Sequence, residues 1–326
     1  MSTILVTGAA GFIGAHLVRA LLARGDRVVG IDNLNPYYDP ALKRARMAAM
    51  VEGAPDGAFA FHQVDLADSD ATLALMADPA IDLVVHLGAQ AGVRWSIEAP
   101  FAYSAANVTG TLAVLEGVRR AEGRIRHLLY ASTSSVYGAR TDAPFVETDR
   151  TDRPASLYAA TKKATELMAS AYADLYGLSL TGLRFFTVYG PWGRPDMAVW
   201  LFTEAMLAGR PIALFNEGRM RRDFTFIDDI VAGLLAVLDG PARPGHRLYN
   251  IGNNRPEPLE ALVAALERAF DVRALRNLLP MQKGDVPATA ADIGAMVQDF
   301  GWHPTTDLAT GIARWAEWWR GYAPAR

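Results

Sequence analysis

A tyrosine and a lysine at i and i+4 spacing, Tyr158 and Lys162, are the residues of this sequence best suited to acid–base chemistry. They lie in a segment, 156–176, whose apolar residues recur at helical spacing and which Gly177 should end. On a helix the two side chains share one side, away from much of the apolar stripe. A lysine ammonium beside a phenol favours the phenolate, so Tyr158 is a candidate proton acceptor. The alternative is an ordinary solvated helix face.

A run of hydroxyl side chains stands where the strand before that helix should end. The β-rich stretch 126–131 leads directly into Ser132, Thr133, Ser134 and Ser135. Consecutive hydroxyl residues are also common in turns. In a parallel sheet, however, ligands bind at the carboxyl ends of the strands. We therefore expect this run to lie at the sheet edge where a cofactor binds.

The N-terminal region predicts a dinucleotide site. An apolar β-rich run at 3–7 precedes Gly8-Ala9-Ala10-Gly11-Phe12-Ile13-Gly14, and a periodic helix follows. In this order, glycines let backbone N–H groups approach a pyrophosphate at a helix N-terminus, although a turn that binds nothing is the alternative. The second strand, 27–31, leads to Asp32, whose carboxylate accepts ribose hydroxyls and repels a 2′-phosphate. This pattern favours NAD over NADP.

Strands and helices alternate through the first half of the chain. Further strands are expected at 59–63, 82–86 and 178–184, with helices at 69–76 and 100–122. Alternation predicts an α/β fold, a Rossmann-type doubly wound parallel sheet with a smaller C-terminal α/β substrate-binding domain. We expect residues 1–188 to form the NAD-binding domain, which a strand and helix within 226–256 rejoin. Residues 189–326 should mainly bind substrate.

Two polar residues near these strands have competing interpretations. Asp65, just past the third strand, could accept a hydrogen bond from an adenine amino group. The alternative is an aspartate that only stabilises a turn or caps a helix. His86 lies in an apolar run, and we expect a packed strand residue without an obvious partner rather than a base.

The composition excludes several classes of function. A net charge of −3 gives no general attraction to nucleic acid or to an anionic membrane. No stretch of ~20 apolar residues predicts a membrane span. The chain has no cysteine, so neither a disulfide nor a thiolate metal site is predicted, and no metal is expected. This fits a reducing compartment, and we expect a cytoplasmic protein.

Together these motifs resemble the extended short-chain dehydrogenases/reductases, in particular their nucleotide-sugar epimerases. The shared segments are Thr7–Gly14, Asp32-Asn33, Asp65-Leu66, Ser132–Gly138, Tyr158-x-x-x-Lys162, Arg222–Asp229 and Gly284–Pro287. A narrower resemblance, to UDP-glucuronate 4-epimerases, rests on Asn35–Asp39 with Lys43, on Gln90–Arg94 and above all on Thr187–Ala198. Gly88 and Trp95 depart from the pattern, since Ala and Tyr are expected there.

The resemblance implies a mechanism for three residues. Tyr158 as phenolate takes the proton of the sugar 4-hydroxyl while C4 passes hydride to NAD. Lys162 lowers the pKa of Tyr158 and binds the nicotinamide ribose, and Thr133 hydrogen-bonds O4. The 4-keto sugar then turns and receives the hydride on its other face, so NAD is regenerated and should stay tightly bound.

The resemblance also assigns binding residues. Those expected to bind the cofactor are Gly8, Gly11, Phe12, Ile13, Gly14, Asp32, Asn33, Lys43, Asp65, Leu66, Leu87, Ala89 and Gln90, with Tyr158 and Lys162. Those expected to bind the UDP-sugar are Arg94, Thr133, Ser134, Ser135, Thr187, Arg194, Phe215, Arg222 and Asp285. Phe215 could stack on uracil and Arg222 could pair with the diphosphate, while Asp285 accepts a ribose hydroxyl or positions the arginine. Helices near 100–122 and 156–175 resemble those that form a homodimer interface.

Neighbouring acids decide the fate of a 4-keto sugar. After the catalytic threonine, the related 4,6-dehydratases carry Asp-Glu and the UDP-glucuronate decarboxylases Ser-Glu, whereas this chain has Ser134-Ser135. A dehydratase is therefore set aside. An epimerase acting on a uronate must also hold the carboxylate against loss of CO₂. Ser135, Thr187 and the fork of Arg194 could do so, with Arg94 as a second candidate.

Three other functions stay open. The first is a UDP-glucose/UDP-galactose 4-epimerase. It would apply if Arg194 is a loop arginine that caps backbone carbonyls and does not meet a sugar carboxylate. A decarboxylase is less favoured. An NAD-binding protein without activity is the third, but such a protein has no need of a tyrosine base beside Thr133 and Lys162.

Overall fold

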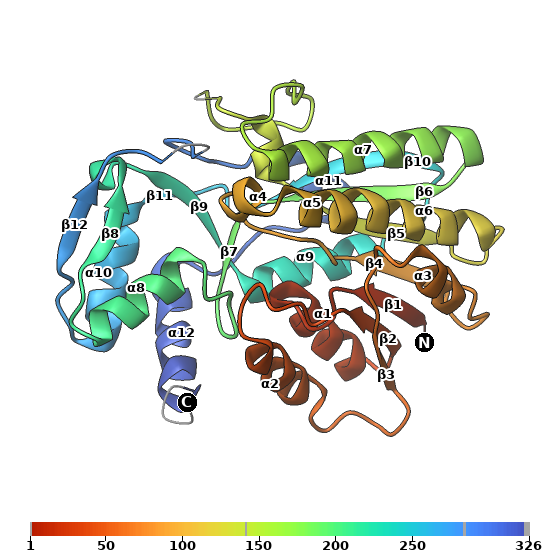
Figure 1. Ribbon diagram of the computed structural model, residues 1–326, viewed down its shortest axis with the longest axis horizontal. Helices are drawn as coiled ribbons and strands as arrows, with labels where there is room; N and C mark the ends of the chain where they lie inside the picture. Colours follow the sequence, from red (N-terminus) through yellow and green to blue (C-terminus); the bar gives the residue numbers. More distant parts are fainter. Residues whose placement is uncertain (1, 141, 283–284, 323–326) are drawn as a thin grey trace. The chain divides into compact units, whose positions relative to one another are not determined.

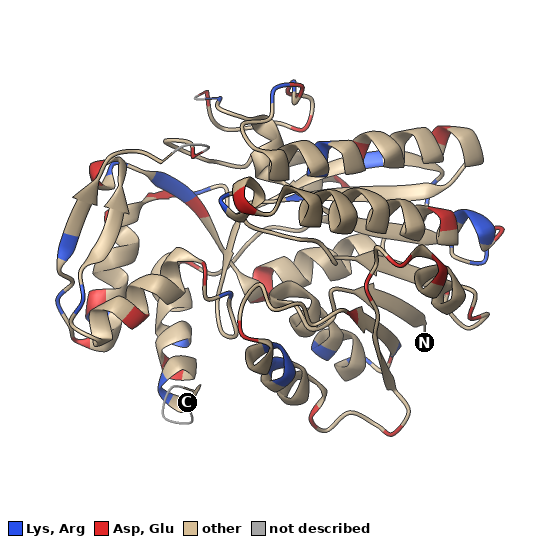
Figure 2. Cartoon of the chain, viewed as in Figure 1, with Lys and Arg blue, Asp and Glu red and all other residues tan. Residues whose placement is uncertain are grey.

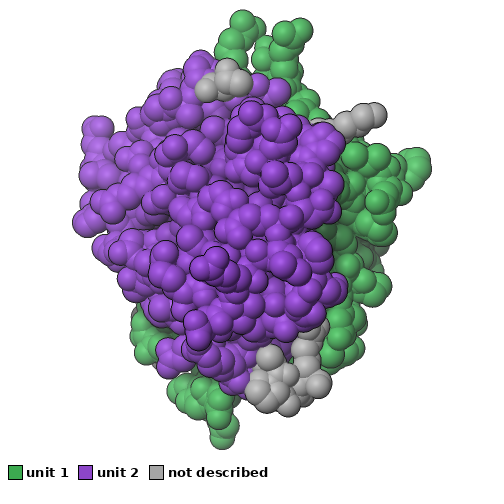
Figure 3. All heavy atoms as spheres, turned by 90° about the vertical axis from the view of Figure 1, so that its left-hand side faces the viewer, with its two compact units in different colours: residues 1–138, 150–184, 234–249 green, residues 139–149, 185–233, 250–326 purple. Residues whose placement is uncertain are grey.

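The computed structural model of the protein describes residues 2–140, 142–282 and 285–322 (Figure 1). Gly284 of the Gly284–Pro287 motif lies outside the described residues. The chain forms two compact units, coloured separately in Figure 3: unit 1 comprises 1–138, 150–184 and 234–249, and unit 2 comprises 139–149, 185–233 and 250–326. The assignment of cofactor binding to 1–188 and of substrate binding to 189–326 stays a prediction.

A seven-stranded sheet, in the order β10-β6-β5-β4-β1-β2-β3, organises the first part of the chain. Its strands are β1 (Thr3–Thr7), β2 (Arg27–Asp32), β3 (Phe59–Gln63), β4 (Leu83–His86), β5 (His127–Thr133), β6 (Ser179–Phe185) and β10 (Gly245–Ile251). β1 pairs in parallel with both β2 and β4, and β2–β3 and β4–β5 are parallel as well. The strand order reverses at β1 and β4, where doubly wound folds bind their ligands. The predicted fold class is confirmed.

Helices flank this sheet. They are α1 (Phe12–Ala23), α2 (Pro40–Val51), α3 (Ser69–Met76), α4 (Trp95–Glu98), α5 (Pro100–Tyr103), α6 (Gly110–Arg120) and α7 (Leu157–Tyr176), with a short 3-10 turn η2 (Ser134–Tyr137). The Ser156 side chain caps α7 by accepting from the Ala159 N–H, and Gly177 ends it with φ of +64°. α6 and α7 lie side by side (Figure 1). The predicted helix at 156–176 is confirmed.

The single helix expected at 100–122 is wrong in detail. The chain there forms α5, then the π-helical segment η1 (Ser104–Thr109), then α6, which ends at Arg120. Single π-helical turns inside α-helices occur frequently at functional sites. In η1, Asn107 forms hydrogen bonds with Gln90 and Thr161.

Apolar side chains of the sheet and of α3, α6 and α7 form one buried cluster. Its members include Leu5, Ile31, Val84, Leu128 and Leu180 from the strands and Met76, Val114, Val118, Ala169 and Ala173 from the helices. Close-packed side chains of this kind fix the positions of α6 and α7 against the sheet.

The later part of the chain contributes two small sheets, ordered β11-β9-β7 and β12-β8. The elements are β7 (Thr187–Tyr189), α8 (Ala198–Leu207), β8 (Ile212–Phe215), the 3-10 turn η3 (Asn216–Gly218), β9 (Arg221–Phe226), α9 (Ile227–Asp239), β11 (Pro256–Pro258), α10 (Leu259–Phe270), β12 (Arg276–Leu279), α11 (Gly294–Phe300) and α12 (Leu308–Tyr322). β9 pairs with β11 through its basic first residues. No helix in the described part of the chain is long and apolar enough to cross a membrane.

Candidate active site

The glycine turn after β1 fits a dinucleotide pyrophosphate. Gly8 has φ of +70°, and a Cβ there would lie 2.8 Å from the Gly88 backbone nitrogen. A Cβ on Gly14 would lie against the Gly8 carbonyl oxygen, so neither Gly8 nor Gly14 tolerates a side chain. Gly11 is the N-cap of α1 and provides no side-chain cap. First-turn N–H groups without a capping side chain are a site for an anion.

The close approach at Gly8 also explains one departure from the family pattern. A Cβ on Gly88 would lie 2.5 Å from Leu66 Cδ1 and 3.0 Å from Thr7 Oγ1. An alanine at position 88 would therefore require the end of the Leu66 side chain to move. Phe12 and Ile13 occupy the first turn of α1, and Leu87 and Ala89 flank Gly88 just past β4.

Asp32, at the end of β2, is held by two contacts. Its Oδ1 accepts from the Leu34 N–H at 2.8 Å and lies 3.6 Å from Lys43 Nζ. Lys43 also donates to Asn35 Oδ1 at 3.2 Å, and the Asn35 amide donates to Gln90 Oε1 at 3.0 Å. These bonds bring together three segments that carry expected cofactor residues, the ends of β2 and β4 and the start of α2.

Asp65 acts as a turn residue in this structure. Its Oδ1 accepts from the Ala67 N–H at 2.9 Å, and its Oδ2 accepts from the Asn33 amide at 3.1 Å. A contact with adenine stays a prediction for Asp65 and Asn33.

His86 is buried on β4, which confirms the expected packed strand residue, and it has two partners that the sequence did not reveal. Its Nδ1 lies 2.7 Å from Thr7 Oγ1 and its Nε2 lies 3.0 Å from Thr111 Oγ1. Burial, together with the charge of Lys162, lowers the pKa of His86 to about 3. A neutral imidazole bonded on both sides ties β1 and β4 to α6 and is not a general base.

The tyrosine and lysine stand on the first turns of α7, and the lysine is buried. Only 2% of Lys162 is exposed, so the interpretation of the pair as a solvated helix face is wrong. Burial lowers the pKa of Lys162 to about 8, and the carboxylate of Glu166 opposes part of that shift. The Tyr158 ring meets the Tyr103 ring edge-on at 6.1 Å between centroids. Tyr103 is fixed in turn because its hydroxyl donates to the Ala91 carbonyl at 2.8 Å.

Asn107, which the sequence analysis missed, connects this helix to the sheet. Its Oδ1 accepts from the Gln90 N–H at 2.8 Å, and its Nδ2 donates to the Gln90 carbonyl at 3.1 Å and to Thr161 Oγ1 at 3.0 Å. Thr161 lies between Tyr158 and Lys162 on α7. The only sequence signal was an asparagine within an expected helix, which is ambiguous without its partners.

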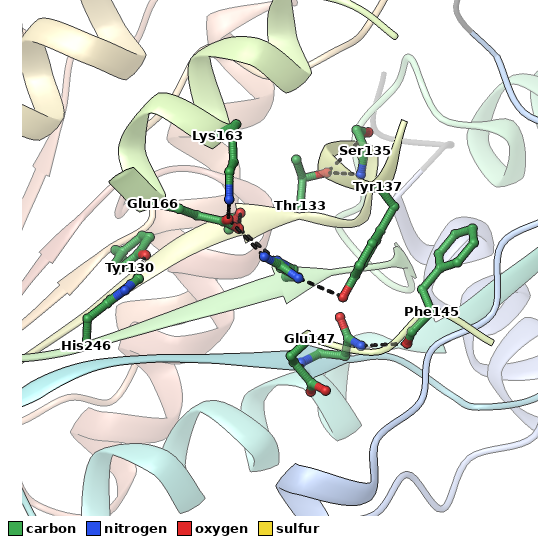
Figure 4. A network of polar contacts seen from close by, with 12 residues as sticks. Tyr130, Thr133, Ser135, Tyr137, Phe145, Glu147, Lys163, Glu166 and His246 are labelled. Carbon is green, nitrogen blue, oxygen red and sulfur yellow. Dashed lines mark hydrogen bonds and ion pairs between the residues drawn. The ribbon is translucent and has the colours of Figure 1, made fainter. Parts of the chain in front are cut away.

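A second missed group, Glu166, lies one turn beyond Lys162 on α7. Figure 4 shows its contact with Lys163. Glu166 receives paired bonds from Arg184 Nε at 2.8 Å and Nη2 at 2.9 Å, and further bonds from Ser132 Oγ at 2.6 Å and Lys163 Nζ at 3.1 Å. Burial alone would raise the pKa of Glu166, but the Arg184 bonds bring it below its ordinary value. Arg184 also donates to the Tyr137 hydroxyl at 3.0 Å, so this ion pair links α7, β5, η2 and β6.

Thr133 ends β5 and caps η2. Its Oγ1 accepts from the Ser135 N–H at 3.2 Å and donates to Ser135 Oγ at 3.3 Å (Figure 4). Ser134 is the first residue of η2. These hydroxyl residues therefore stabilise a turn in this structure, and their contact with a sugar stays a prediction.

Unit 2 contains a pocket of about 310 Å³. Its lining includes Thr187 on β7, the loop residues Gly193 and Arg194, Met197 and Ala198 at the start of α8, and Trp200, Phe224 and Trp315. Of the expected substrate residues, Thr187 and Arg194 line this pocket.

The loop that carries Arg194 is held by aromatic packing. Trp192 has φ of +62°, which is unusual for a residue other than glycine. Its ring packs on Trp318 and Tyr322 of α12, each at 5.3 Å between centroids. Trp315, Trp318 and Trp319 all pack around Trp200, so these tryptophans act as packing anchors.

Arg194 forms a paired contact that the sequence analysis did not foresee. Its Nε donates to Asp196 Oδ1 at 2.9 Å and its Nη2 donates to Asp196 Oδ2 at 2.6 Å. The alternative candidate, Arg94, is exposed at the start of α4.

Arg222 and Asp285, both expected to bind nucleotide, pair with each other. Arg222 Nη2 donates to Asp285 Oδ1 at 2.6 Å. Burial lowers the pKa of Arg222, and the Asp285 charge opposes the shift. β9 carries Arg222 in a basic stretch that is followed at once by an acidic residue (Figure 2). Phe215 lies at the end of β8, half-buried.

Comparison with known proteins assigns the chain to a family. A model of the NAD dependent epimerase/dehydratase family matches residues 4–252. UDP-glucuronate 4-epimerase 4 of Arabidopsis thaliana is 48% identical over 337 residues, which cover 98% of this chain and 76% of the plant protein. UDP-glucuronic acid 4-epimerase from Bacillus cereus, solved with UDP-glucuronic acid and NAD, is 33% identical with a TM-score of 0.90, over 98% of this chain and 99% of that one. UDP-glucose 4-epimerase from Thermotoga maritima, solved with UDP-glucose, is 29% identical with a TM-score of 0.87, over 98% of this chain and 99% of that one. The chain therefore belongs to the NAD dependent epimerase/dehydratase family.

Proposed function

We propose that this protein interconverts UDP-glucuronate and UDP-galacturonate by inverting C4 through a transient 4-keto sugar. The observation that carries the proposal is its 48% identity, over 98% of the chain, to a UDP-glucuronate 4-epimerase. The neutral UDP-hexose epimerase from Thermotoga maritima is less similar, at 29% identity.

The residues of α7 and β5 perform the proton chemistry. NAD, held by the glycine turn and Asp32, supplies the hydride acceptor and donor at C4 when bound. Tyr158 as phenolate takes the proton from the 4-hydroxyl and later returns it to O4, so no proton is consumed over the cycle. Lys162, protonated below about pH 8, stabilises the phenolate. Thr133 donates a hydrogen bond to O4 and orients it.

Arg194 recognises the sugar carboxylate in this proposal, with the hydroxyls of Thr187 and Ser135. A guanidinium meets a carboxylate with paired donors and fixes its plane. Ser134 and Ser135 offer hydroxyls in place of the acid that dehydratases use, so the carboxylate is held without a group that would promote loss of CO₂.

The nucleotide is anchored at a distance from C4. Phe215 stacks on uracil and Arg222 pairs with the diphosphate. The 2.6 Å contact with Arg222 favours Asp285 as the residue that positions this arginine. Anchoring remote from the reacting carbon lets the keto sugar turn while the nucleotide stays bound.

Incubation of the purified protein with UDP-glucuronate and, separately, UDP-glucose tests the proposal. No NAD is added, and nucleotide sugars are resolved by chromatography and proton NMR. UDP-galacturonate from the uronate alone is expected. Conversion of only the neutral sugar would assign a UDP-glucose 4-epimerase, and UDP-xylose would assign a decarboxylase. Bound NAD without turnover of either sugar would indicate a binding protein.

A homodimer is the proposed assembly, in the cytoplasm. Phe101 on α5 is 88% exposed, and Leu112 on α6 and Leu167 and Leu175 on α7 are exposed as well. Apolar side chains gathered on neighbouring helices are typical of an interface between subunits. Light scattering after size exclusion should give twice the mass of the 35.3 kDa chain, and the mass of one chain would contradict the proposal.

A further inference from the structure

Asp196 gives the carboxylate-binding arginine an internal carboxylate partner. We infer that Asp196 competes with the sugar carboxylate for the Arg194 guanidinium, and thereby sets how strongly the site prefers an acidic sugar over a neutral one. This inference rests on the proposed function, because it takes Arg194 as the residue that meets the sugar.

The geometry of the pair limits how Arg194 can meet a second carboxylate. Bonds of 2.9 Å and 2.6 Å to Asp196 occupy the Nε and Nη2 edge of Arg194. The N–H donors of a guanidinium lie in one plane in a fixed fork. A second carboxylate that binds with paired bonds must therefore use the Nη1 and Nη2 end, where it shares Nη2 with Asp196, or must displace Asp196.

Arg194 lines the pocket of unit 2, whereas Asp196 does not belong to its lining. Arg194 belongs to the lining of the 310 Å³ pocket, together with Thr187 and Met197. The side chains of Arg194 and Asp196 are 22% and 31% exposed, so the ion pair is only partly screened by water. A charge on Asp196 therefore acts on any ligand charge that Arg194 meets.

The backbone keeps the two residues together. The Gly193 N–H donates to the Gly190 carbonyl at 3.0 Å, and the Met197 N–H donates to the Arg194 carbonyl at 3.2 Å. The first bond closes a turn just before the pair and the second closes a turn that contains both residues, while Trp192 packs on α12. The pairing of Arg194 with Asp196 is thus built into the loop.

The two classes of ligand respond differently to this pairing. With a neutral sugar, the Arg194–Asp196 bonds stay intact and Arg194 keeps a charged partner. With an acidic sugar, two carboxylates share one guanidinium and repel each other. Asp196→Asn removes the repulsion for the acidic sugar and takes the Asp196 charge away from Arg194 beside the neutral one. Selectivity for the uronate should therefore increase.

Binding measurements test this directly. Isothermal titration in the presence of saturating NAD would use the Tyr158→Phe background, in which turnover should be slowed strongly. The ligands are UDP-glucuronate, UDP-glucose and UDP. Asp196→Asn should raise the ratio of the UDP-glucose Kd to the UDP-glucuronate Kd by about 2- to 10-fold, or ~0.4–1.4 kcal/mol, and should leave the Kd for UDP unchanged.

A matched control is available elsewhere in the chain. Arg140 forms the same type of fork with Asp142, with bonds of 3.2 Å and 2.6 Å and the same spacing in sequence. Neither residue lines the pocket. Asp142→Asn should leave the Kd ratio unchanged. In an Arg194→Gln background, Asp196→Asn should also have no effect on the ratio, because the arginine that couples the two carboxylates is gone.

An unchanged or lowered ratio in Asp196→Asn would overturn the inference, as would an equal rise in the Arg194→Gln background. If Asp196→Asn loses binding of UDP, Asp196→Ser is measured by the same criterion. Turnover by the unmodified enzyme tests the proposed function separately. An enzyme that makes UDP-galacturonate but shows no change of ratio in Asp196→Asn would refute only the role of Asp196.

Discussion

Replacing Glu166 by glutamine should destabilise the protein far more than an ordinary loss of a surface charge. The variant keeps the size of the side chain and removes its charge, so the Arg184 guanidinium stays buried beside a neutral amide. Both side chains of the pair are only 1% exposed. Removing one partner of a buried ion pair typically costs about 3–5 kcal/mol, because the remaining charge is left uncompensated. Since the Gln carbonyl can still accept one Arg184 bond, we expect a value near the lower end, ~3 kcal/mol.

Urea unfolding at neutral pH, followed by circular dichroism, would measure this loss of unfolding free energy. Glu116→Gln is the matched control, because Glu116 also pairs with an arginine, Arg119, through two bonds but on the surface of α6. That control should cost less than ~1 kcal/mol. A double variant with Glu166→Leu and Arg184→Met removes both charges and should recover about 1–4 kcal/mol relative to Glu166→Gln. A loss below ~1 kcal/mol in Glu166→Gln would refute this account of the buried pair.

The pH dependence of the same variant follows from the lowered pKa of Glu166. A carboxyl whose pKa is lower in the folded state contributes stability above its unfolded pKa, ~4.3, and loses it as pH falls through the folded pKa. Glu166→Gln should lack this acid-side contribution, so its deficit in unfolding free energy should shrink below ~pH 4. A deficit that stays constant down to acid pH would contradict the lowered pKa.

Three further predictions concern the catalytic residues. Tyr158→Phe should lower kcat by about 10²–10⁴-fold while NAD binding, followed by titration, is retained; a loss of NAD binding would instead point to a structural role. Because the pKa of Lys162 is lowered to about 8, activity measured against pH should fall on the alkaline side near that value, as the charge that stabilises the Tyr158 phenolate is lost. The effect of Lys162 on stability has the opposite sign. Below about pH 8 the folded protein carries the cost of burying the Lys162 charge. That cost is relieved between pH 8 and the pKa of the unfolded state, ~10.4, so the contribution of Lys162 to the unfolding free energy rises with pH in this window. Asp32→Ser should raise the affinity for NADP relative to NAD in competition binding, because the carboxylate that repels a 2′-phosphate is removed; an unchanged ratio would show that Asp32 does not face the ribose.

The sequence by itself determined the features that depend on neighbours along the chain. The strand, glycine turn and helix at the N-terminus follow from local propensity and from the intolerance of the turn for any Cβ, as at Gly8 and Gly14. Likewise, Ser156 and Gly177 mark both ends of α7, because capping uses groups within one turn of the helix end. The positions of Tyr158 and Lys162 on one helix were therefore predictable.

Only the tertiary structure decided which side chains these residues meet. Helical periodicity placed Lys162 away from the apolar stripe, whereas packing of α7 against the sheet and η1 buries it. The partners that control its surroundings come from distant segments. Glu166 is bound by Arg184 on β6, and Asn107 joins Gln90 to Thr161. Period and propensity act over a few residues, but burial and ion pairing depend on which segments the fold brings together, so the electrostatics of this site could be derived only from the folded chain.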